Sequence, residues 1–124
     1  MAKILVVDDE PLLRAMLGDA LEEAGYIVVT ADSGRAAIAR AKADRPDCIL
    51  LDVMMPDLDG YETCAALKAN PDLAAIPIIL ISATTDLRVV DRAEQVGAIE
   101  VLPKPVPLPQ LHQAVALALH PPQA

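Results

Sequence analysis

The chain has 124 residues and a net charge of −8, from 10 Lys and Arg against 18 Asp and Glu. Hydrophobic residues make up 54%, which is enough for one folded core and excludes a disordered tail or a coiled coil. The acidic balance and the presence of only two aromatic residues argue against direct binding of nucleic acid. No apolar run approaches the roughly 20 residues that span a bilayer, and no signal-peptide pattern is present, so we expect a cytoplasmic protein without membrane contact.

Short apolar runs alternate with helical patterns along the whole chain, which is typical of a parallel sheet with crossover helices. Several runs are apolar at successive positions, as expected when helices cover both faces of the sheet. The expected strands are 3–7, 26–30, 48–53, 77–82 and 98–102. The expected helices are 11–24, 33–44, 59–69, 86–96 and 107–119.

The helix ends carry signals of their own. Gly25 lies where a glycine would end the first helix. Ser33, Asp59 and Thr85 each stand just ahead of a helical pattern and are predicted N-caps. Arg14 lies off the apolar stripe of the first helix and is expected on a polar face.

The domain organisation follows from this pattern. We expect one domain over 1–120 and a tail or the start of a linker over 121–124, because the ending HPPQA stops the last helix. Cys48 and Cys64 are too few for a disulfide scaffold or a four-ligand zinc site. Both are expected to be reduced thiols in the core.

Polar residues stand at the carboxyl ends of the expected strands, where open parallel sheets bind ligands. They are Asp8, Asp9, Asp52, Ser82 and Lys104. Three carboxylates at one edge repel each other unless a cation is present, and Mg²⁺ suits them because it prefers oxygen ligands and keeps positions for water or phosphate. Lys104 and Ser82 can then hold phosphoryl oxygens.

Four motifs occur in order along the chain: VVDDE at 6–10, LLDVMMPDLDG at 50–60, Ile-Ser-Ala at 81–83 and PKP at 103–105. Together they resemble the receiver domain of bacterial two-component response regulators, over essentially the whole chain. The resemblance implies an α/β, flavodoxin-like (βα)5 fold, which is a doubly wound parallel five-stranded sheet with strand order 2-1-3-4-5. Asp8, Asp9 and Asp52 would then meet between the first and third strands.

The resemblance also implies roles for the acidic residues. Asp52 would accept a phosphoryl group from a phosphohistidine on a sensor histidine kinase or a phosphotransfer protein. Asp9 would bind Mg²⁺ directly, with Asp8 binding directly or through water. Asp52 itself and the backbone carbonyl of Met54 would complete the protein ligands.

The same resemblance covers the other side of the site. Ser82 and Lys104 would hold the phosphoryl oxygens, and the small Ala83 would leave the approach open. Pro105 matches a position where the family has a cis peptide bond, which would aim the lysine into the site.

The sequence departs from the family pattern at several positions. Val101 stands where the family usually has the Tyr or Phe of its switch, and Val106 where it often has Phe. Met54 and Thr84 flank the route of water to the acyl phosphate and leave its lifetime open. In the family, the aromatic side chain at the position of Val101 turns inward when the domain is phosphorylated, and the short, β-branched valine cannot reproduce that movement. We therefore expect switching to depend on Ser82, Ala83 and Thr84.

Other functions are less consistent with these residues. The chain is expected to catalyse only its own phosphorylation and dephosphorylation, without turning over a substrate. An aspartate-nucleophile phosphatase would need a second carboxylate where Met54 stands, and a flavin carrier would need a hydroxyl- and glycine-rich loop after the first strand rather than DDEPLL. A receiver-like binding module with weak or lost switching remains an alternative because of Val101.

Overall fold

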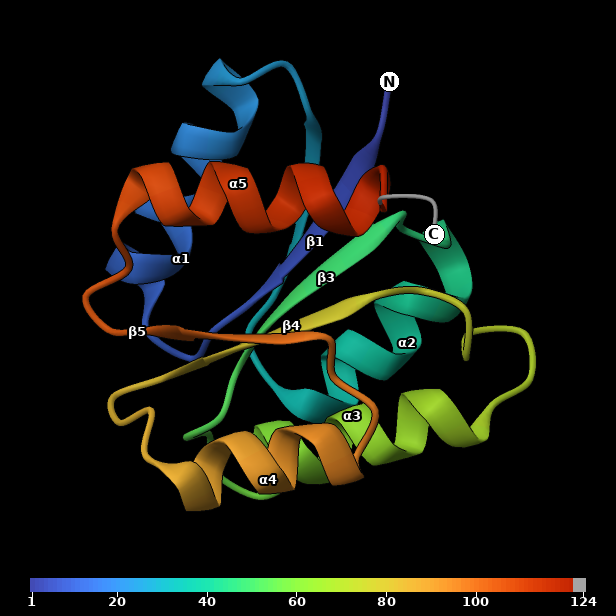
Figure 1. Cartoon of the computed structure of the whole chain (residues 1–124). Helices are drawn as coiled ribbons and strands as arrows, with labels where there is room; N and C mark the ends of the chain where they lie inside the picture. The colour runs from blue at the N-terminus through green and yellow to red at the C-terminus, as the bar shows by residue number, and fades with distance from the viewer. Residues whose placement is uncertain (122–124) are drawn as a thin grey trace.

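A computed structural model describes residues 1–121 of the chain, and it consists of a sheet between two layers of helices (Figure 1). The parallel strands have the order β2-β1-β3-β4-β5. They are β1 Lys3–Val7, β2 Ile27–Ala31, β3 Cys48–Asp52, β4 Ile78–Ser82 and β5 Glu100–Pro103. The helices are α1 Pro11–Glu23, α2 Gly34–Asp44, α3 Gly60–Ala69, α4 Leu87–Gln95 and α5 Leu108–Leu119. The flavodoxin-like fold and the strand order expected from the sequence are confirmed.

Each face of the sheet buries its own apolar cluster. Helices α1 and α5 cover one face, where Leu21 and Leu111 pack against strand residues such as Leu50. Helices α2, α3 and α4 cover the other, where Leu67 packs with residues such as Leu51. Every residue of β3 and β4 is buried, which explains why their sequences are apolar at successive positions.

The strand register aligns the carboxyl ends at one edge of the sheet. Val7 pairs with Leu51 across β1 and β3, and Asp52 pairs with Ile81 across β3 and β4. Ser82 pairs with Pro103 across β4 and β5. Residues that follow these positions along each strand therefore leave the sheet close together.

Two of the three predicted N-caps are confirmed. The Ser33 side chain accepts a hydrogen bond from the Ala36 N–H at 3.1 Å. Asp59 and Glu62 form a reciprocal capping box at the start of α3. The prediction for Thr85 is wrong, because Asp86 stands one residue nearer and its carboxylate accepts from two N–H groups of α4.

The expected strand starts at 26 and 98 are wrong by one and two residues, since β2 begins at Ile27 and β5 at Glu100. In both places the residue at the expected start is still hydrogen-bonded to the preceding helix. Tyr26 N–H donates to the Leu21 carbonyl at 3.1 Å, and Ala98 N–H donates to the Ala93 carbonyl at 2.9 Å. Gly25, with φ +98°, ends α1 as expected.

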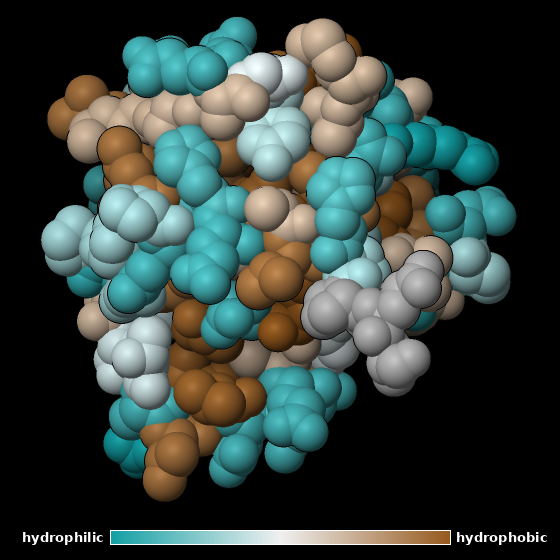
Figure 2. Space-filling model, turned by 45° about the horizontal axis from the view of Figure 1, so that its top comes forward, coloured by the Kyte–Doolittle hydropathy of each residue, from teal (hydrophilic) through white to brown (hydrophobic). Residues whose placement is uncertain are grey.

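The remaining expectations concern the cysteines and the surface. Both cysteines are free and buried, and burial raises the pKa of Cys48 to about 12 and that of Cys64 to about 11. Within residues 1–121, no helix has the length and apolar character needed to cross a bilayer. On the face shown in Figure 2, apolar patches lie between hydrophilic side chains. Of the expected tail at 121–124, residues 122–124 lie outside the described residues.

Candidate functional site

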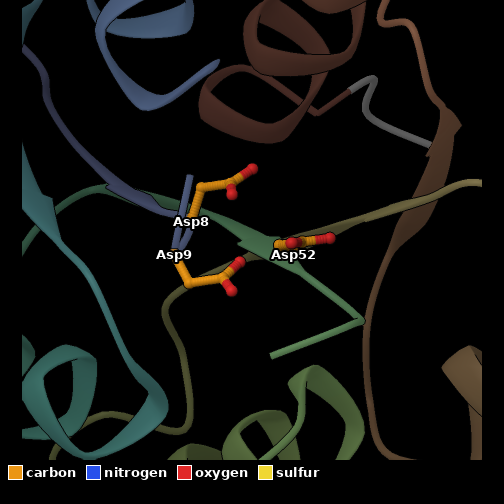
Figure 3. Close-up of side chains that lie close together, drawn as sticks. All are labelled: Asp8, Asp9 and Asp52. Carbon is orange, nitrogen blue, oxygen red and sulfur yellow. The ribbon is translucent and has the colours of Figure 1, made fainter. Parts of the chain in front are cut away.

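Three carboxylates meet at the carboxyl edge of the sheet. Asp8 and Asp9 follow β1, and Asp52 ends β3 beside them (Figure 3). One oxygen from each lies within 4.8 Å of the others. Asp8 and Asp52 are almost wholly buried, whereas Asp9 is exposed. The structure therefore brings together the acidic residues that the sequence pattern selected.

The turn after β1 is held by hydrogen bonds to its own backbone. Asp8 N–H continues the sheet by donating to the Ala31 carbonyl at 3.2 Å. One oxygen of the Asp8 side chain accepts from the Glu10 N–H at 2.8 Å, which tightens the turn before α1 begins at Pro11. Asp8 is thus a turn residue as well as a member of the acidic cluster.

Asp52 is fixed by the loop that follows it. Its Oδ1 accepts a long hydrogen bond of 3.4 Å from the Met54 N–H. Gly60 N–H donates to the Val53 carbonyl at 2.9 Å, and a Cβ at Gly60 would lie 2.7 Å from the Val53 Cα and overlap the Asp52 carbonyl. Only glycine allows the start of α3 to pass this close to the end of β3.

Lys104 enters the site from the loop after β5. Its Nζ lies 2.9 Å from Asp52 Oδ1 and 3.7 Å from Asp8 Oδ2. Its backbone N–H donates to the Ser82 carbonyl at 2.9 Å, and the following bond to Pro105 is cis, as expected. The lysine is therefore anchored at its backbone and directed at the carboxylates.

Ser82 ends β4 and is 3% exposed. Its hydroxyl oxygen accepts from the Thr84 N–H at 3.3 Å. Ala83 and Thr84 are themselves exposed. Ser82 thus lies at the same sheet edge as Asp52, and the segment that follows it is exposed to solvent.

The charges at the site are unbalanced. Burial raises the pKa of the Asp52 carboxyl, and the Asp8 carboxylate raises it further, although Lys104 opposes the rise. Burial alone would lower the pKa of the Lys104 ammonium, but the carboxylates of Asp52 and Asp8 outweigh it and raise that pKa. One lysine does not satisfy three carboxylates, so the site favours a further cation.

The donor set fits a hard divalent cation. Among residues 1–121, Asp8 Oδ2 and Asp52 Oδ2 are buried and lack a hydrogen-bond partner. The Lys104 ammonium lies 3.7 Å from Asp8 Oδ2, beyond hydrogen-bond distance, and buried carboxylate oxygens without a donor are costly. An all-oxygen site with one exposed member, Asp9, matches the preference of Mg²⁺ for a few carboxylates together with water or phosphate.

The expected switch position is built differently from the acidic site. Val101 is half-buried on β5 and lines a hollow of about 250 Å³ against α4, together with Val90 and Ala93. On α4, the guanidinium of the exposed Arg92 lies 4.5 Å from the centre of the Tyr61 ring of α3. Sequence analysis did not find this pair, because nothing in the local pattern of either helix places one against the other.

Sequence analysis also missed a contact of Arg14. The side chain was expected on a polar face, but it is half-buried and its Nη1 donates to the Asp8 carbonyl at 2.7 Å. A charged residue in the first turn of a helix gives no sign of which way it turns, so the pattern alone could not predict this bond.

Residues 4–116 match the response regulator receiver domain, and the chain belongs to this family. Receiver domains of this family bind Mg²⁺ at an acidic pocket, accept phosphate from histidine kinases or phosphotransfer proteins, and generally act as signal transducers rather than as enzymes.

Three relatives illustrate the similarity. Response regulator MprA of Mycolicibacterium vanbaalenii is 40% identical over 109 residues, which are 88% of this chain and 46% of MprA. Protein PilG of Pseudomonas aeruginosa is 34% identical over 113 residues, which are 91% of this chain and 84% of PilG. The structure of the Vibrio cholerae chemotaxis protein CheY4 superposes with a TM-score of 0.92 at 35% identity, covering 96% of this chain and 99% of CheY4. The chain thus spans about half the length of MprA and most of PilG.

Proposed function

We propose that this receiver domain is a phosphorylation-controlled switch in which Asp52 is the phosphoacceptor. The observation that carries the proposal is the setting of Asp52. It is a carboxylate at the end of a fully buried strand, 2.9 Å from the Lys104 ammonium and beside the carboxylates of Asp8 and Asp9. A structural role alone does not account for so much buried charge at one edge.

The reaction transfers a phosphoryl group from the imidazole nitrogen of a phosphohistidine. An oxygen of Asp52 forms the new O–P bond while the N–P bond breaks and returns its electron pair to the imidazole. Lys104 and the Ser82 hydroxyl hold phosphoryl oxygens, so that the group lies in line with the attacking carboxylate. Positioning and charge neutralisation supply most of the catalysis in such transfers, which this small set of residues provides.

Mg²⁺ would be held by Asp8, Asp9, Asp52 and the backbone carbonyl of Met54, and it would neutralise charge on the carboxylates and the phosphoryl oxygens. The two buried carboxylate oxygens that lack a hydrogen-bond partner among residues 1–121, Asp8 Oδ2 and Asp52 Oδ2, support this assignment. The partners of the reaction are a sensor histidine kinase or a phosphotransfer protein and Mg²⁺, with no direct contact to nucleic acid or membrane.

The signal leaves the site through the segment after β4. The backbone of Ser82 and of residues 83–86 shifts toward the phosphoryl group, and this shift tilts the start of α4. Val101 keeps one rotamer, because a β-branched side chain is restricted and short. The second candidate, a receiver-like binding module with weak or lost switching, is favoured by that same Val101, since one contact that would stabilise an active state is missing.

Intact-protein mass spectrometry tests the proposal. The chain is incubated with Mg²⁺ and a small phosphodonor such as acetyl phosphate, and one phosphoryl group is expected per molecule. Asp52→Asn abolishes the addition. Asp57→Asn is the matched control, since Asp57 lies in the exposed loop after β3 with φ +65°, which asparagine tolerates, and it leaves the addition unchanged. Stoichiometric labelling of Asp52→Asn would remove Asp52 from this role.

A further inference from the structure

The Arg14 side chain joins α1 to the acidic turn after β1. Its Nη1 donates to the Asp8 carbonyl at 2.7 Å, and its own backbone N–H donates to the Glu10 carbonyl at 3.0 Å. Arg14 therefore holds the backbone at both ends of the turn, at the Asp8 carbonyl and at the Glu10 carbonyl. Hydrogen bonds from a charged donor are among the stronger ones.

The Asp8 carbonyl has a particular importance because it belongs to the peptide group that links Asp8 to Asp9. A change in the ψ angle of Asp8 would turn that peptide group and move the Cα of Asp9. Asp8 is also fixed by its buried position and by its bond to the Glu10 N–H at 2.8 Å. Asp9 is exposed, and no side-chain hydrogen bond to it occurs within the described chain, 1–121. The direction of the Asp9 carboxylate thus depends on the backbone that Arg14 holds.

We propose that Arg14 is a positioning residue for the cation site: by fixing the Asp8–Asp9 peptide it directs the Asp9 carboxylate toward Asp8 and Asp52. The inference rests on the proposed function in that it takes these carboxylates as the site of Mg²⁺. Partners in the outer shell of a metal site typically contribute about 10- to 100-fold in affinity. We expect the lower end of that range, because Arg14 acts through one peptide group.

A purely electrostatic role for Arg14 predicts the opposite sign. A guanidinium beside three carboxylates repels a divalent cation, so its removal would tighten Mg²⁺ binding if charge alone mattered. If Arg14 positions Asp9, its removal weakens binding in spite of the more negative site. The direction of the change therefore separates the two roles.

Arg40 provides the matched control. Arg14 and Arg40 line the same open hollow of about 510 Å³ beside β2 and α2, so both bring a guanidinium to this hollow. Arg40 pairs with Asp44 of its own helix at 2.8 Å, and no hydrogen bond joins it to the turn after β1 within residues 1–121. Arg40→Ala removes the same charge without touching the Asp8–Asp9 peptide.

The experiment measures the Mg²⁺ dissociation constant of the full chain by titration of amide NMR shifts with MgCl2, well below the melting temperature of each variant. Arg14→Ala is expected to weaken binding about 10-fold, whereas Arg40→Ala leaves it within about twofold of wild type. Arg14→Lys recovers part of the loss, because an ammonium can donate one bond to the same carbonyl. If Arg14→Ala does not fold, the comparison of Arg14→Lys with wild type carries the test, with weaker binding expected.

Unchanged or tighter Mg²⁺ binding in both Arg14 variants would overturn the inference, and so would a loss of the same size in Arg40→Ala. A fall in melting temperature with an unchanged dissociation constant would show that Arg14 is only structural. The test does not involve phosphorylation. A wild-type chain that binds Mg²⁺ but is not phosphorylated would contradict the proposed function while leaving the role of Arg14 open to the same measurement.

Discussion

The two ends of the carboxyl edge of the sheet are built in different ways. At β1 and β3, Asp8 and Asp52 are buried and are held by hydrogen bonds and by Lys104. Beyond β4, the chain from Ala83 to Arg88 is exposed, and α4 buries only Ala93. The groups that would carry out the chemistry are therefore fixed, while the segment that would carry the signal is loosely covered.

This difference has a physical basis. Phosphoryl transfer requires groups placed to within a fraction of an ångström, which the buried strand ends and the 2.9 Å contact of Asp52 with Lys104 supply. A switch requires a segment whose alternative positions differ little in free energy. In the proposed function, the exposed start of α4 and the hollow beside Val101 would supply such a segment without an aromatic side chain on β5.

The largest effect is expected from removing the exposed ligand of the acidic site. Asp9→Ala abolishes measurable Mg²⁺ binding and with it phosphorylation, because it removes the exposed carboxylate that is assigned to bind the cation directly. Lys104→Ala leaves Mg²⁺ binding in place but weakens the hold on the phosphoryl group. Calorimetric titration with MgCl2 checks both variants. Wild-type Mg²⁺ affinity in Asp9→Ala would refute the assignment.

Gly60→Ala tests how rigidly the end of β3 is held. A Cβ there meets backbone atoms of Asp52 and Val53, which cannot move aside as a side chain could. We expect a loss of roughly 1–3 kcal/mol in unfolding free energy and slower phosphorylation.

Gly18→Ala is the control for that change. A Cβ at Gly18, inside α1, lies 3.5 Å from the Val28 Cγ1, an ordinary contact. Because alanine is the better helix former, stability should rise by about 0.5–1 kcal/mol. Urea unfolding measures both variants, and equal stability of Gly60→Ala and wild type would show that the loop after β3 adapts easily.

The charge imbalance at the acidic site predicts that Asp52→Asn stabilises the fold although it removes the proposed phosphoacceptor. Because burial raises the pKa of Asp52, the folded chain binds this proton more tightly than the unfolded chain does. The free energy of unfolding therefore falls as pH rises from the pKa of Asp52 in the unfolded chain, near 3.8, to its raised pKa in the folded chain. Without Mg²⁺, Asp52→Asn should melt a few degrees higher at neutral pH, with the difference shrinking toward acid pH. A lower melting point across that range would contradict this reasoning.

The smallest effect is expected at the start of α4. Asp86 accepts from the N–H groups of Arg88 and Val89, and these hydrogen bonds, chiefly that from Val89, lower its pKa. Its capping contribution is therefore present above the unfolded pKa and is lost as pH falls through the folded pKa. Asp86→Ala should speed amide exchange in the first turn of α4 and leave Mg²⁺ binding unchanged. Equal exchange rates would show that α4 does not depend on this cap.

Much of this architecture could be predicted from the sequence, for reasons that differ along the chain. Fully buried strands such as β3 require continuous apolar runs, and a buried polar residue at the end of such a run, such as Asp52, is conspicuous. Because parallel strands end at one edge, the acidic site followed from strand ends alone. The cap at Thr85 failed because two adjacent residues were both good caps, and only the backbone angles select Asp86.

Contacts between elements could not be predicted in the same way. The bond from Arg14 to the Asp8 carbonyl and the contact of Arg92 with Tyr61 depend on the rotamers of long side chains and on how helices sit over the sheet. The spacing of residues along the chain predicts neither contact. Arg14 also joins the acidic site to α1, and Arg92 brings α4 into contact with Tyr61 of α3.

The most direct test of the account compares amide NMR shifts of the free chain with those of the chain bound to Mg²⁺ and beryllofluoride, which occupies the phosphoryl position. The proposed switch predicts shifts at Asp52 and Lys104, larger shifts through 83–90 as the start of α4 tilts, and a Val101 side chain that keeps one rotamer. If residues 83–96 keep their shifts while those of Asp52 and Lys104 change, the proposed route for the signal is wrong.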